Sequence, residues 1–150
     1  MNEMVIRQAV EADVFSICEL QQKWLEEDNT YGIVPANSDE IKSRPDEYFL
    51  VAETAKGIVG FIAGSVQVSA DTAVIPANCL YLEIDDLYVI PPFRGQGVGS
   101  QLVDQLLTNA KGRGLDYATL YSAAKDIHAI LRFYERHRFQ SWYVQMLRKL

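Results

Sequence analysis

The 150-residue sequence lacks the features of membrane-spanning, secreted and nucleic-acid-binding proteins. Its longest apolar runs fall far short of the roughly 20 residues that a membrane helix needs. It has only two cysteines, Cys18 and Cys79, and its first residues show no secretory pattern. Basic residues are also few, with 14 Lys and Arg against 20 Asp and Glu, whereas nucleic-acid binders usually carry a basic face. We therefore expect a cytoplasmic protein that binds neither membranes nor nucleic acid.

Potential metal ligands are equally sparse. His128 and His137 lie far from both cysteines in the sequence, and no CxxC or HExxH spacing occurs. We therefore expect no metal site. The net charge of −6 gives the chain a long-range field that favours cationic small molecules.

Apolar residues, in contrast, make up 49% of the chain, which is enough for a buried core in a single domain spanning residues 1–150. Alternating and β-rich runs predict strands over 5–8, 48–53, 58–66, 79–89, 117–122 and 142–147. Helical spacing of apolar residues predicts helices over 11–25, 38–43, 97–110 and after Asp126. This order combines hairpins with a strand-helix-strand crossover. It indicates an α+β fold with a mixed, mostly antiparallel sheet flanked by helices.

The strand predicted over 79–89 changes the parity of its apolar residues. Leu80, Leu82 and Ile84 occupy even positions, whereas Leu87 and Val89 occupy odd ones. A regular strand cannot move its buried face in this way, but one inserted residue restores the alternation. The sequence therefore predicts a β-bulge at Asp85 and Asp86, with the strand bent beyond it.

A glycine-rich turn, Arg94-Gly95-Gln96-Gly97-Val98-Gly99-Ser100, connects that strand to the next helix. Free amides and the dipole at a helix N-terminus, together with a permanent cation, suit a diphosphate. A Walker A loop is excluded because no lysine is present. The dinucleotide fingerprint is broken at Ser100, and Asp116 precedes its strand, which disfavours a nucleotide-dependent oxidoreductase.

The spacing of Arg94, Gly97 and Gly99 closely resembles the acetyl-CoA-binding motif of the GNAT N-acetyltransferases. A second segment, from Phe133 to Phe139, resembles the Tyr-Glu-Lys-x-Gly-Phe signature of the same family, and the order of elements matches over nearly the whole chain. The resemblance implies a GNAT-like fold in which the central strands splay apart. It also implies an enzyme that transfers the acetyl group of acetyl-CoA to a primary amine.

The resemblance implies roles for individual residues. The pantetheine arm of acetyl-CoA would pair with the backbone of the bulged strand, and the diphosphate would bind the glycine-rich turn. These expected contacts are Leu87, Tyr88, Val89, Arg94, Gly95, Gln96, Gly97, Val98, Gly99 and Ser100. Tyr134 would protonate the departing thiolate, although its helical spacing also suits a core residue. Glu83 would be the general base, with Asp85 as a competitor and Asp86 tied to the bulge.

Two departures from the family pattern affect these expectations. Arg138 replaces the glycine before Phe139, so we expect the helix to end differently. The chain after Phe139 has room for one strand only, so the acceptor pocket would depend more on the segment 26–40, with Asp28 and Tyr31, and on the loop 69–78. Asp85 is also an expected acceptor contact. The free edge of that last strand would allow a homodimer. A catalytically silent acyl-CoA-binding sensor or partner module is the alternative to an enzyme.

Overall fold

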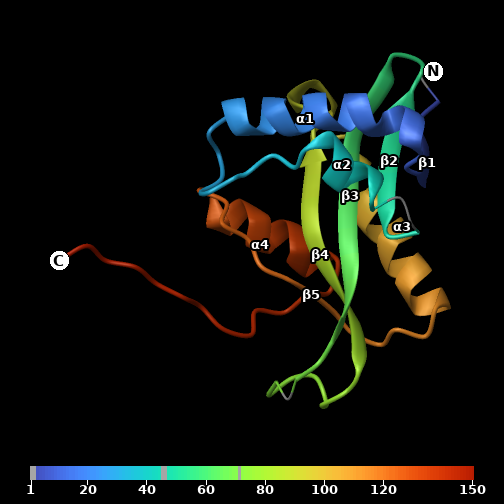
Figure 1. The fold of residues 1–150 in the computed structure, drawn as a ribbon. Helices are drawn as coiled ribbons and strands as arrows, with labels where there is room; N and C mark the ends of the chain where they lie inside the picture. The colour runs from blue at the N-terminus through green and yellow to red at the C-terminus, as the bar shows by residue number, and fades with distance from the viewer. Residues whose placement is uncertain (1–2, 45–46, 71) are drawn as a thin grey trace.

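A five-stranded sheet organises the chain in a computed structural model, which describes residues 3–44, 47–70 and 72–150. The strand order is β1-β2-β3-β4-β5; neighbouring strands from β1 to β4 are antiparallel, and β5 is parallel to β4 (Figure 1). The sheet is therefore mixed and mostly antiparallel, which confirms the α+β class predicted from the sequence.

The elements largely follow the predicted order. The strands are β1 (Val5–Gln8), β2 (Phe49–Thr54), β3 (Gly57–Val68), β4 (Leu80–Val89) and β5 (Ala118–Leu120). The α-helices are α1 (Val14–Glu26), α2 (Ser38–Lys42), α3 (Val98–Gly112) and α4 (Ile127–Arg136), and short 3₁₀ turns cover Glu11–Asp13 and Pro91–Phe93. The N-cap of α2 is Asn37, one residue before the start predicted from the sequence, because the Asn37 side chain accepts from the amides of Asp39 and Glu40.

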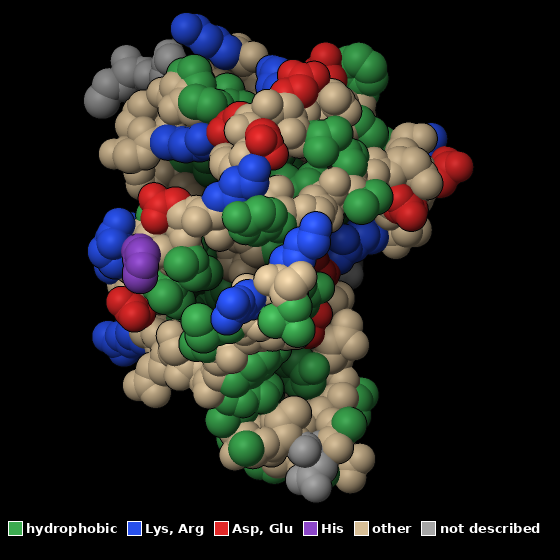
Figure 2. All heavy atoms as spheres, turned by 90° about the vertical axis from the view of Figure 1, so that its left-hand side faces the viewer, with side chains coloured by type: hydrophobic (Ala, Val, Ile, Leu, Met, Phe, Trp, Pro, Cys, Tyr) green, Lys and Arg blue, Asp and Glu red, His purple; other side chains and the backbone are tan. Residues whose placement is uncertain are grey.

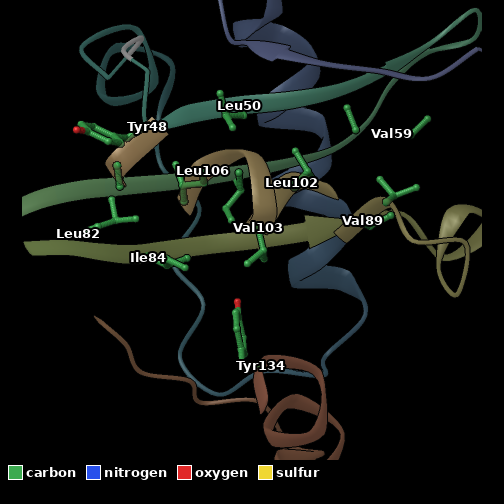
Figure 3. Close-up of a cluster of buried hydrophobic side chains, with 14 of the residues drawn as sticks. Tyr48, Leu50, Val59, Leu82, Ile84, Val89, Leu102, Val103, Leu106 and Tyr134 are labelled. Carbon is green, nitrogen blue, oxygen red and sulfur yellow. The ribbon is translucent and has the colours of Figure 1, made fainter. Parts of the chain in front are cut away.

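Helices cover both faces of the sheet, which divides the core into two clusters. On one face, Leu102, Val103 and Leu106 of α3 are fully buried against Leu82 and Ile84 of β4 (Figure 3). On the other face, α1 and α2 pack onto the sheet through apolar residues that include Ile17, Leu20, Ile41 and Phe61. Because β2 and β3 are buried on both faces, their sequences read as continuous apolar runs rather than alternating ones.

The bulge predicted in β4 is present. Ala63 of β3 pairs with Asp86, whereas its neighbour Gly64 pairs with Ile84, so Asp85 is the extra residue. A side chain at Gly64 would meet Leu82 and Glu83 at 2.9–3.0 Å, and glycine therefore allows the strands to approach closely here. Beyond the bulge, Leu87 and Val89 rejoin the α3 side and Tyr88 joins the α1 side.

Strands β4 and β5 separate soon after they pair. Their register covers only Leu82–Ile84 of β4 against Ala118–Leu120 of β5. The predicted strand 117–122 is thus shorter than expected, and the chain beyond Leu120 diverges from the bulged half of β4. This divergence produces the splayed centre that the family resemblance implied.

The strand predicted over residues 142–147 is wrong. Residues 138–150 form no helix or strand, and in Figure 1 the chain after α4 runs away from the body to the C-terminus. All residues from Gln140 to Leu150 are exposed. A β-rich sequence forms a strand only where another strand edge pairs with it, and the tail contacts none in the single chain.

The expectation that Arg138 would change the end of α4 is also wrong. Arg138 adopts the left-handed conformation itself, with φ +66°. The amide of Phe139 donates to the carbonyl of Tyr134, and that of Arg138 donates to Glu135, which is the bonding of a Schellman motif. The Phe139 ring also packs edge-on against Tyr134, with centroids 5.5 Å apart. These contacts offset the roughly 1–2 kcal/mol cost of a left-handed non-glycine residue.

Candidate active site

A cleft of about 830 Å³ lies where β4 and β5 separate. Its walls are the bulged half of β4, residues 120–126 at the end of β5 and after it, one side of α4, and the segment 28–36 between α1 and α2. The loop and the chain after β5 are joined by backbone hydrogen bonds, in which Tyr31 donates to Ala123 and Lys125 donates to Asn29. Gln21 and Trp24 of α1 and the side chain of Arg94 complete the wall, so the cleft is built from segments that are distant in the sequence.

Tyr134 is the predicted acid, and it lines this cleft from α4. Its ring points from the helix toward β4, with the hydroxyl at the far end (Figure 3). The residue is 9% exposed, and burial raises the pKa of the phenol. The hydroxyl has no hydrogen-bond partner among the described residues. In those residues every fully buried side-chain polar atom does have a partner, so the hydroxyl oxygen of Tyr134 is not fully buried. The hydroxyl is therefore a neutral donor that opens into the cleft.

Three carboxylates of β4 have different surroundings. Asp85, the extra residue of the bulge, lines the cleft but is held by an ion pair with Arg44. Asp86 also lines the cleft and has no hydrogen-bond partner among the described residues. Burial raises the pKa of the Asp86 carboxyl, and nearby Asp85 adds to this while Arg44 opposes it. Glu83 lies opposite Ser65 of β3 and is not part of the cleft wall.

Arg94 joins the mouth of the cleft to α1. Its guanidinium donates to both carboxylate oxygens of Glu27 at 2.7 and 2.8 Å and to the carbonyl of Val89 at 2.7 Å. The Tyr88 hydroxyl donates to the same carboxylate at 2.5 Å, and Arg94 lies over the Tyr88 ring. Burial alone would raise the pKa of Glu27, but the hydrogen bonds from Arg94 and Tyr88 hold it below its usual value. Arg94 is thus fixed against α1 rather than extended over the turn.

The glycine-rich turn follows directly after Arg94. Gly95 and Gly97 have φ of +69° and +83°, and Gly97 is the N-cap of α3. The first helical bond is from the amide of Gln101 to the carbonyl of Gly97, so the amides of Val98, Gly99 and Ser100 are free of helical carbonyls. A Cβ at Gly95 would meet nothing within 4 Å. These residues form an open helix N-terminus that suits an anion.

The predicted acceptor residues Asp28 and Tyr31 also line the cleft. Both interact with Lys125, which donates to the Asp28 carboxylate at 2.8 Å and lies over the Tyr31 ring. Asp28 and Asp85 are therefore already paired with cations. Among the cleft residues of the described chain, Asp86 is the carboxylate without a hydrogen-bonded or ion-paired partner.

The structure thus gathers most of the predicted site residues around one cleft. Leu87, Tyr88, Val89 and Arg94 line it, together with Tyr134, Asp28, Tyr31 and Asp85. The turn from Gly95 to Ser100 follows Arg94 outside the cleft, and Glu83 lies apart. Sequence reasoning missed Trp24, which stacks on Tyr88, as well as Glu27, Lys125 and the exposure of Asp86 to the cleft. The unusual pair of carboxylates at the bulge was the available signal for Asp86.

Two negative findings apply to the described residues. No group of three or more His, Cys, Asp or Glu side chains is placed to hold a metal ion. Within the same ranges, no helix has the length and apolar character needed to cross a bilayer.

Comparison with known proteins agrees with this geometry. The profile of the Acetyltransferase (GNAT) family matches residues 14–139, so the chain belongs to the GNAT family. A mycothiol acetyltransferase of Thermobispora bispora is 33% identical over 99 residues, which are 66% of this chain and 32% of that protein. An uncharacterized N-acetyltransferase of Methanocaldococcus jannaschii is 29% identical over 100 residues, which are 67% of this chain and 42% of that protein. The chain therefore spans less than half the length of either relative.

Solved structures show the same fold. A transcriptional regulator from Bacillus halodurans superposes with a TM-score of 0.76 at 22% identity, covering 99% of this chain and 100% of that one. An aminoglycoside N-acetyltransferase in complex with CoA superposes with a TM-score of 0.72 at 19% identity, covering 99% and 96%. At these identities the likeness establishes the fold alone, which has the mixed sheet and splayed centre described above.

Proposed function

We propose that this chain is an N-acetyltransferase that moves the acetyl group of acetyl-CoA to a primary amine. Family membership supports the reaction type, and the cleft supports the chemistry. The observation that carries the proposal is the Tyr134 hydroxyl, which is buried, neutral and without a hydrogen-bond partner among the described residues, at the splay between β4 and β5. Such a phenol is suited to donate a proton to a leaving group.

The residues present fit acetyl-CoA. Beyond the point where β4 pairs with β5, the backbone of Leu87 and the amide of Val89 are directed away from β3 and are available to an extended pantetheine arm. Tyr88 directs its backbone groups to β3, and the Val89 carbonyl already accepts from Arg94. The free amides at the start of α3 would hold the diphosphate, with Gly95 and Gly97 allowing close approach. Arg94 would either keep its bond to Glu27 and position the turn, or exchange Glu27 for a phosphate.

In the proposed reaction, the amine nitrogen attacks the thioester carbon while the carbon–sulfur bond breaks. Tyr134 donates its proton to the departing thiolate, and a carboxylate accepts the proton that the amine loses. A carboxylate needs a raised pKa to act as this base. Acetyl-CoA supplies the activated acetyl group, and the chain supplies the two proton-transfer groups and their placement.

We further propose Asp86 as the base. Its position opposite Ala63 places it on the α1 side of the sheet, whereas Tyr134 belongs to the cluster on the α3 side. Acid and base would then flank the thioester from opposite faces. Glu83 remains a candidate only through a water relay, because its side chain is not part of the cleft wall. Asp28 and Asp85 are neutralised by Lys125 and Arg44, so the carboxylate of Asp86 and the net charge of −6 are what favour a cationic amine as acceptor.

The cytoplasm is the proposed location. Cys18 and Cys79 are both free thiols, which is the usual state in a reducing compartment.

The first test measures CoA thiol release with acetyl-CoA and a panel of cationic, neutral and anionic amines. We expect turnover with cationic primary amines. In that assay Asp86→Asn should lower kcat/KM at neutral pH by about 100-fold or more, and the loss should shrink at high pH, where free amine needs no base. Glu83→Gln is the matched control on the same strand and should change the rate little. Acetyl-CoA binding without thiol release from any amine would instead identify a sensor module.

If the Glu83→Gln profile shows the larger loss and Asp86→Asn runs parallel to wild type at every pH, the base is Glu83. If the best acceptor is anionic, the charge argument fails while the acetyltransferase activity stands.

A further inference from the structure

His137, at the end of α4, is a titratable side chain that the proposed reaction leaves unused. Charged side chains spread over the surface, as the face in Figure 2 shows, whereas the His137 side chain is only 7% exposed. Its ring contacts two side chains of α3: Nδ1 lies 2.9 Å from Oδ1 of Asp104, and Nε2 lies 3.2 Å from Oγ of Ser100. The imidazole therefore bridges α4 to the first two turns of α3, beside the free amides proposed to hold the diphosphate.

Phe133 fixes the position of this imidazole. The centroid of its ring lies 5.0 Å from that of His137 and 4.9 Å from that of Tyr134. Phe133 also packs against the start of α3, since a Cβ at Gly99 would lie 3.5 Å from its ring. The imidazole is thus held by the same aromatic group as the proposed acid, and a change in its protonation acts on contacts that are already in place.

In the neutral form, His137 occupies the hydroxyl of Ser100. A carboxylate only accepts hydrogen bonds, so the contact with Asp104 assigns the single ring proton to Nδ1. Nε2 is then the acceptor, and the Ser100 hydroxyl donates to it. The hydroxyl proton is therefore committed to the imidazole and is not available to an anion.

Protonation reverses the direction of one hydrogen bond and keeps both contacts. The two nitrogens of an imidazolium both donate, so Nε2 donates to the Ser100 oxygen while Asp104 still accepts from Nδ1. The hydroxyl proton of Ser100 is then free. A helical side chain is tilted toward the N-terminus of its helix, so this hydroxyl lies toward the same end of α3 as the free amides. The two states share one geometry and differ in what Ser100 offers to an anion.

The charged groups near His137 come from α3 and from its own segment. Asp104 is the charged contact on α3, and its side chain is 68% exposed. Glu135, Arg136 and Arg138 flank His137 in the sequence. Against these fixed neighbours, protonation adds one positive charge near the N-terminal end of α3, where the helix dipole already favours an anion.

We propose that His137 is a positioning residue whose protonation releases the Ser100 hydroxyl to the diphosphate of acetyl-CoA and so strengthens cofactor binding. This role rests on the proposed function, because it requires the diphosphate at the start of α3. Histidine is the side chain that ordinarily changes charge between about pH 5 and 8, so the affinity should rise as the pH falls through that range. Binding and protonation are linked, so the bound cofactor should in turn draw a proton onto His137.

The first experiment measures the Kd of dephospho-CoA for the wild-type chain by calorimetry from about pH 5.5 to about 8.5. This ligand keeps the diphosphate but lacks the 3′-phosphate, a monoester that itself titrates at about pH 6. The Kd should be at least about tenfold lower at the acidic end, which is the effect of one hydrogen bond to a charged group. If dephospho-CoA binds too weakly, CoA replaces it, since its own titration cancels when wild type and variant are compared.

Three variants assign the effect to its residues. His137→Gln should have a Kd that does not change with pH, and Ser100→Ala should lose most of the gain at acidic pH. His128→Gln is the matched control, because His128 is the other histidine of the chain, lies on the same helix and is exposed. It should keep the full pH dependence. Thermal unfolding checks each variant, and if His137→Gln is unstable, Ser100→Ala carries the test with the imidazole in place.

The second experiment needs no ligand. Long-range proton–nitrogen NMR of the free chain at about pH 8.5 should show His137 as the Nδ1–H tautomer, because the carboxylate of Asp104 requires that proton. The Nε2–H tautomer would mean that the Ser100 hydroxyl is already free in the neutral form, and it would overturn the proposal.

The binding data can overturn it independently. A wild-type Kd that is constant with pH, or lower at the alkaline end, would leave His137 with a structural role only while the cofactor site stands. Loss of the pH dependence in His128→Gln would assign it to that histidine, and its full retention in Ser100→Ala would exclude the hydroxyl. If neither acetyl-CoA nor CoA binds at any pH, the cofactor site itself fails, and the role of His137 fails with it for that separate reason.

Discussion

At the residue scale, Tyr134 is held by aromatic neighbours rather than by hydrogen bonds. Phe133 packs edge-on against its ring at 4.9 Å and Phe139 does so at 5.5 Å. The backbone at the end of α4 also depends on it, since its carbonyl accepts from His137 and Phe139. The ring and backbone are thus structural, whereas the hydroxyl contributes no hydrogen bond to the fold. The two roles can be separated by removing the hydroxyl alone.

Tyr134→Phe should lower kcat about ten- to a thousandfold, because it removes one positioned proton donor while the ring packing stays. The melting temperature should change little. Steady-state thiol release and thermal unfolding measure these two quantities. Tyr121→Phe, at an exposed tyrosine of the same cleft, is the control and should keep full activity. An unchanged single-turnover rate for Tyr134→Phe would limit Tyr134 to its packing role.

Arg94 has a partner that its motif does not predict. The sequence places the guanidinium of Arg94 directly before the glycine-rich turn. The guanidinium, however, is bound by Glu27, which lies 67 positions earlier in the chain. The pairing links the glycine-rich turn to α1 and contributes to the wall of the cleft.

At the scale of elements, the joint between β1 and α1 depends on one buried carboxylate. Asp13 is 8% exposed, accepts two hydrogen bonds from Arg7 at 2.7 and 2.9 Å, and accepts a third from the amide of Val10. The bonds from Arg7 lower the pKa of Asp13, although burial opposes them, and the Val10 amide adds to the effect. Arg7 also donates to Glu53 of β2, so the same cation joins three elements.

Asp13→Asn should destabilise the fold by about 2 kcal/mol at pH 7, because it leaves Arg7 without its buried partner. The folded pKa of Asp13 lies below the unfolded value of about 3.9, so its contribution is present above that pH and is lost as the pH falls through the folded pKa. Urea unfolding at pH 7 and at pH 3 should therefore show a smaller difference between variant and wild type at pH 3. A difference that stays constant with pH would mean that the charge of Asp13 is not involved.

Glu53→Gln is the comparison for that experiment. Glu53 shares Arg7 but is 43% exposed, and exposed ion pairs contribute little. Its substitution should leave stability almost unchanged at both pH values.

At the scale of the whole molecule, the cleft results from a single departure from regular sheet geometry. One extra residue in β4 turns the strand, and β5 cannot follow it beyond Leu120. Side chains from α1, α4 and the segment 28–36 then surround the gap, and the end of β4 leads directly into the N-terminus of α3. A bound ligand that fills the cleft and contacts that N-terminus should therefore stabilise the molecule as a unit.

Acetyl-CoA at a hundred times its Kd should stabilise the fold by about 2.7 kcal/mol, which corresponds to a rise in Tm of about 5 to 10 °C. Gly97→Val should remove most of that rise, because a branched side chain disfavours φ +83° and stands in front of the free amides. Differential scanning fluorimetry with and without acetyl-CoA measures the shift.

Gly114→Val is the matched control for this prediction. Gly114 follows the other end of α3 with φ +82° and has open space around it, so the variant carries similar backbone strain without blocking the turn. It should lose Tm in the free state and keep the acetyl-CoA shift. A normal shift in Gly97→Val would show that the diphosphate binds elsewhere.

The sequence by itself determined the features that depend on neighbouring residues. Apolar periodicity located α1, α3, α4 and the first four strands, and the change of parity between Ile84 and Leu87 located the bulge. The glycines at 95 and 97 marked the turn, because few other residues adopt positive φ there. These signals are local, since backbone preference and face alternation are set by residues a few positions apart.

Only the tertiary structure decided which side chains share the cleft. Asp86 lines it and Glu83 does not, because the bulge changes which way the residues on either side of it point. Arg94 meets Glu27, and Asp28 meets Lys125, across 67 and 97 positions of sequence. The tail 142–147 has the composition of a strand but remains unpaired in the single chain, because a strand is completed by the edge beside it and its own sequence cannot supply that edge.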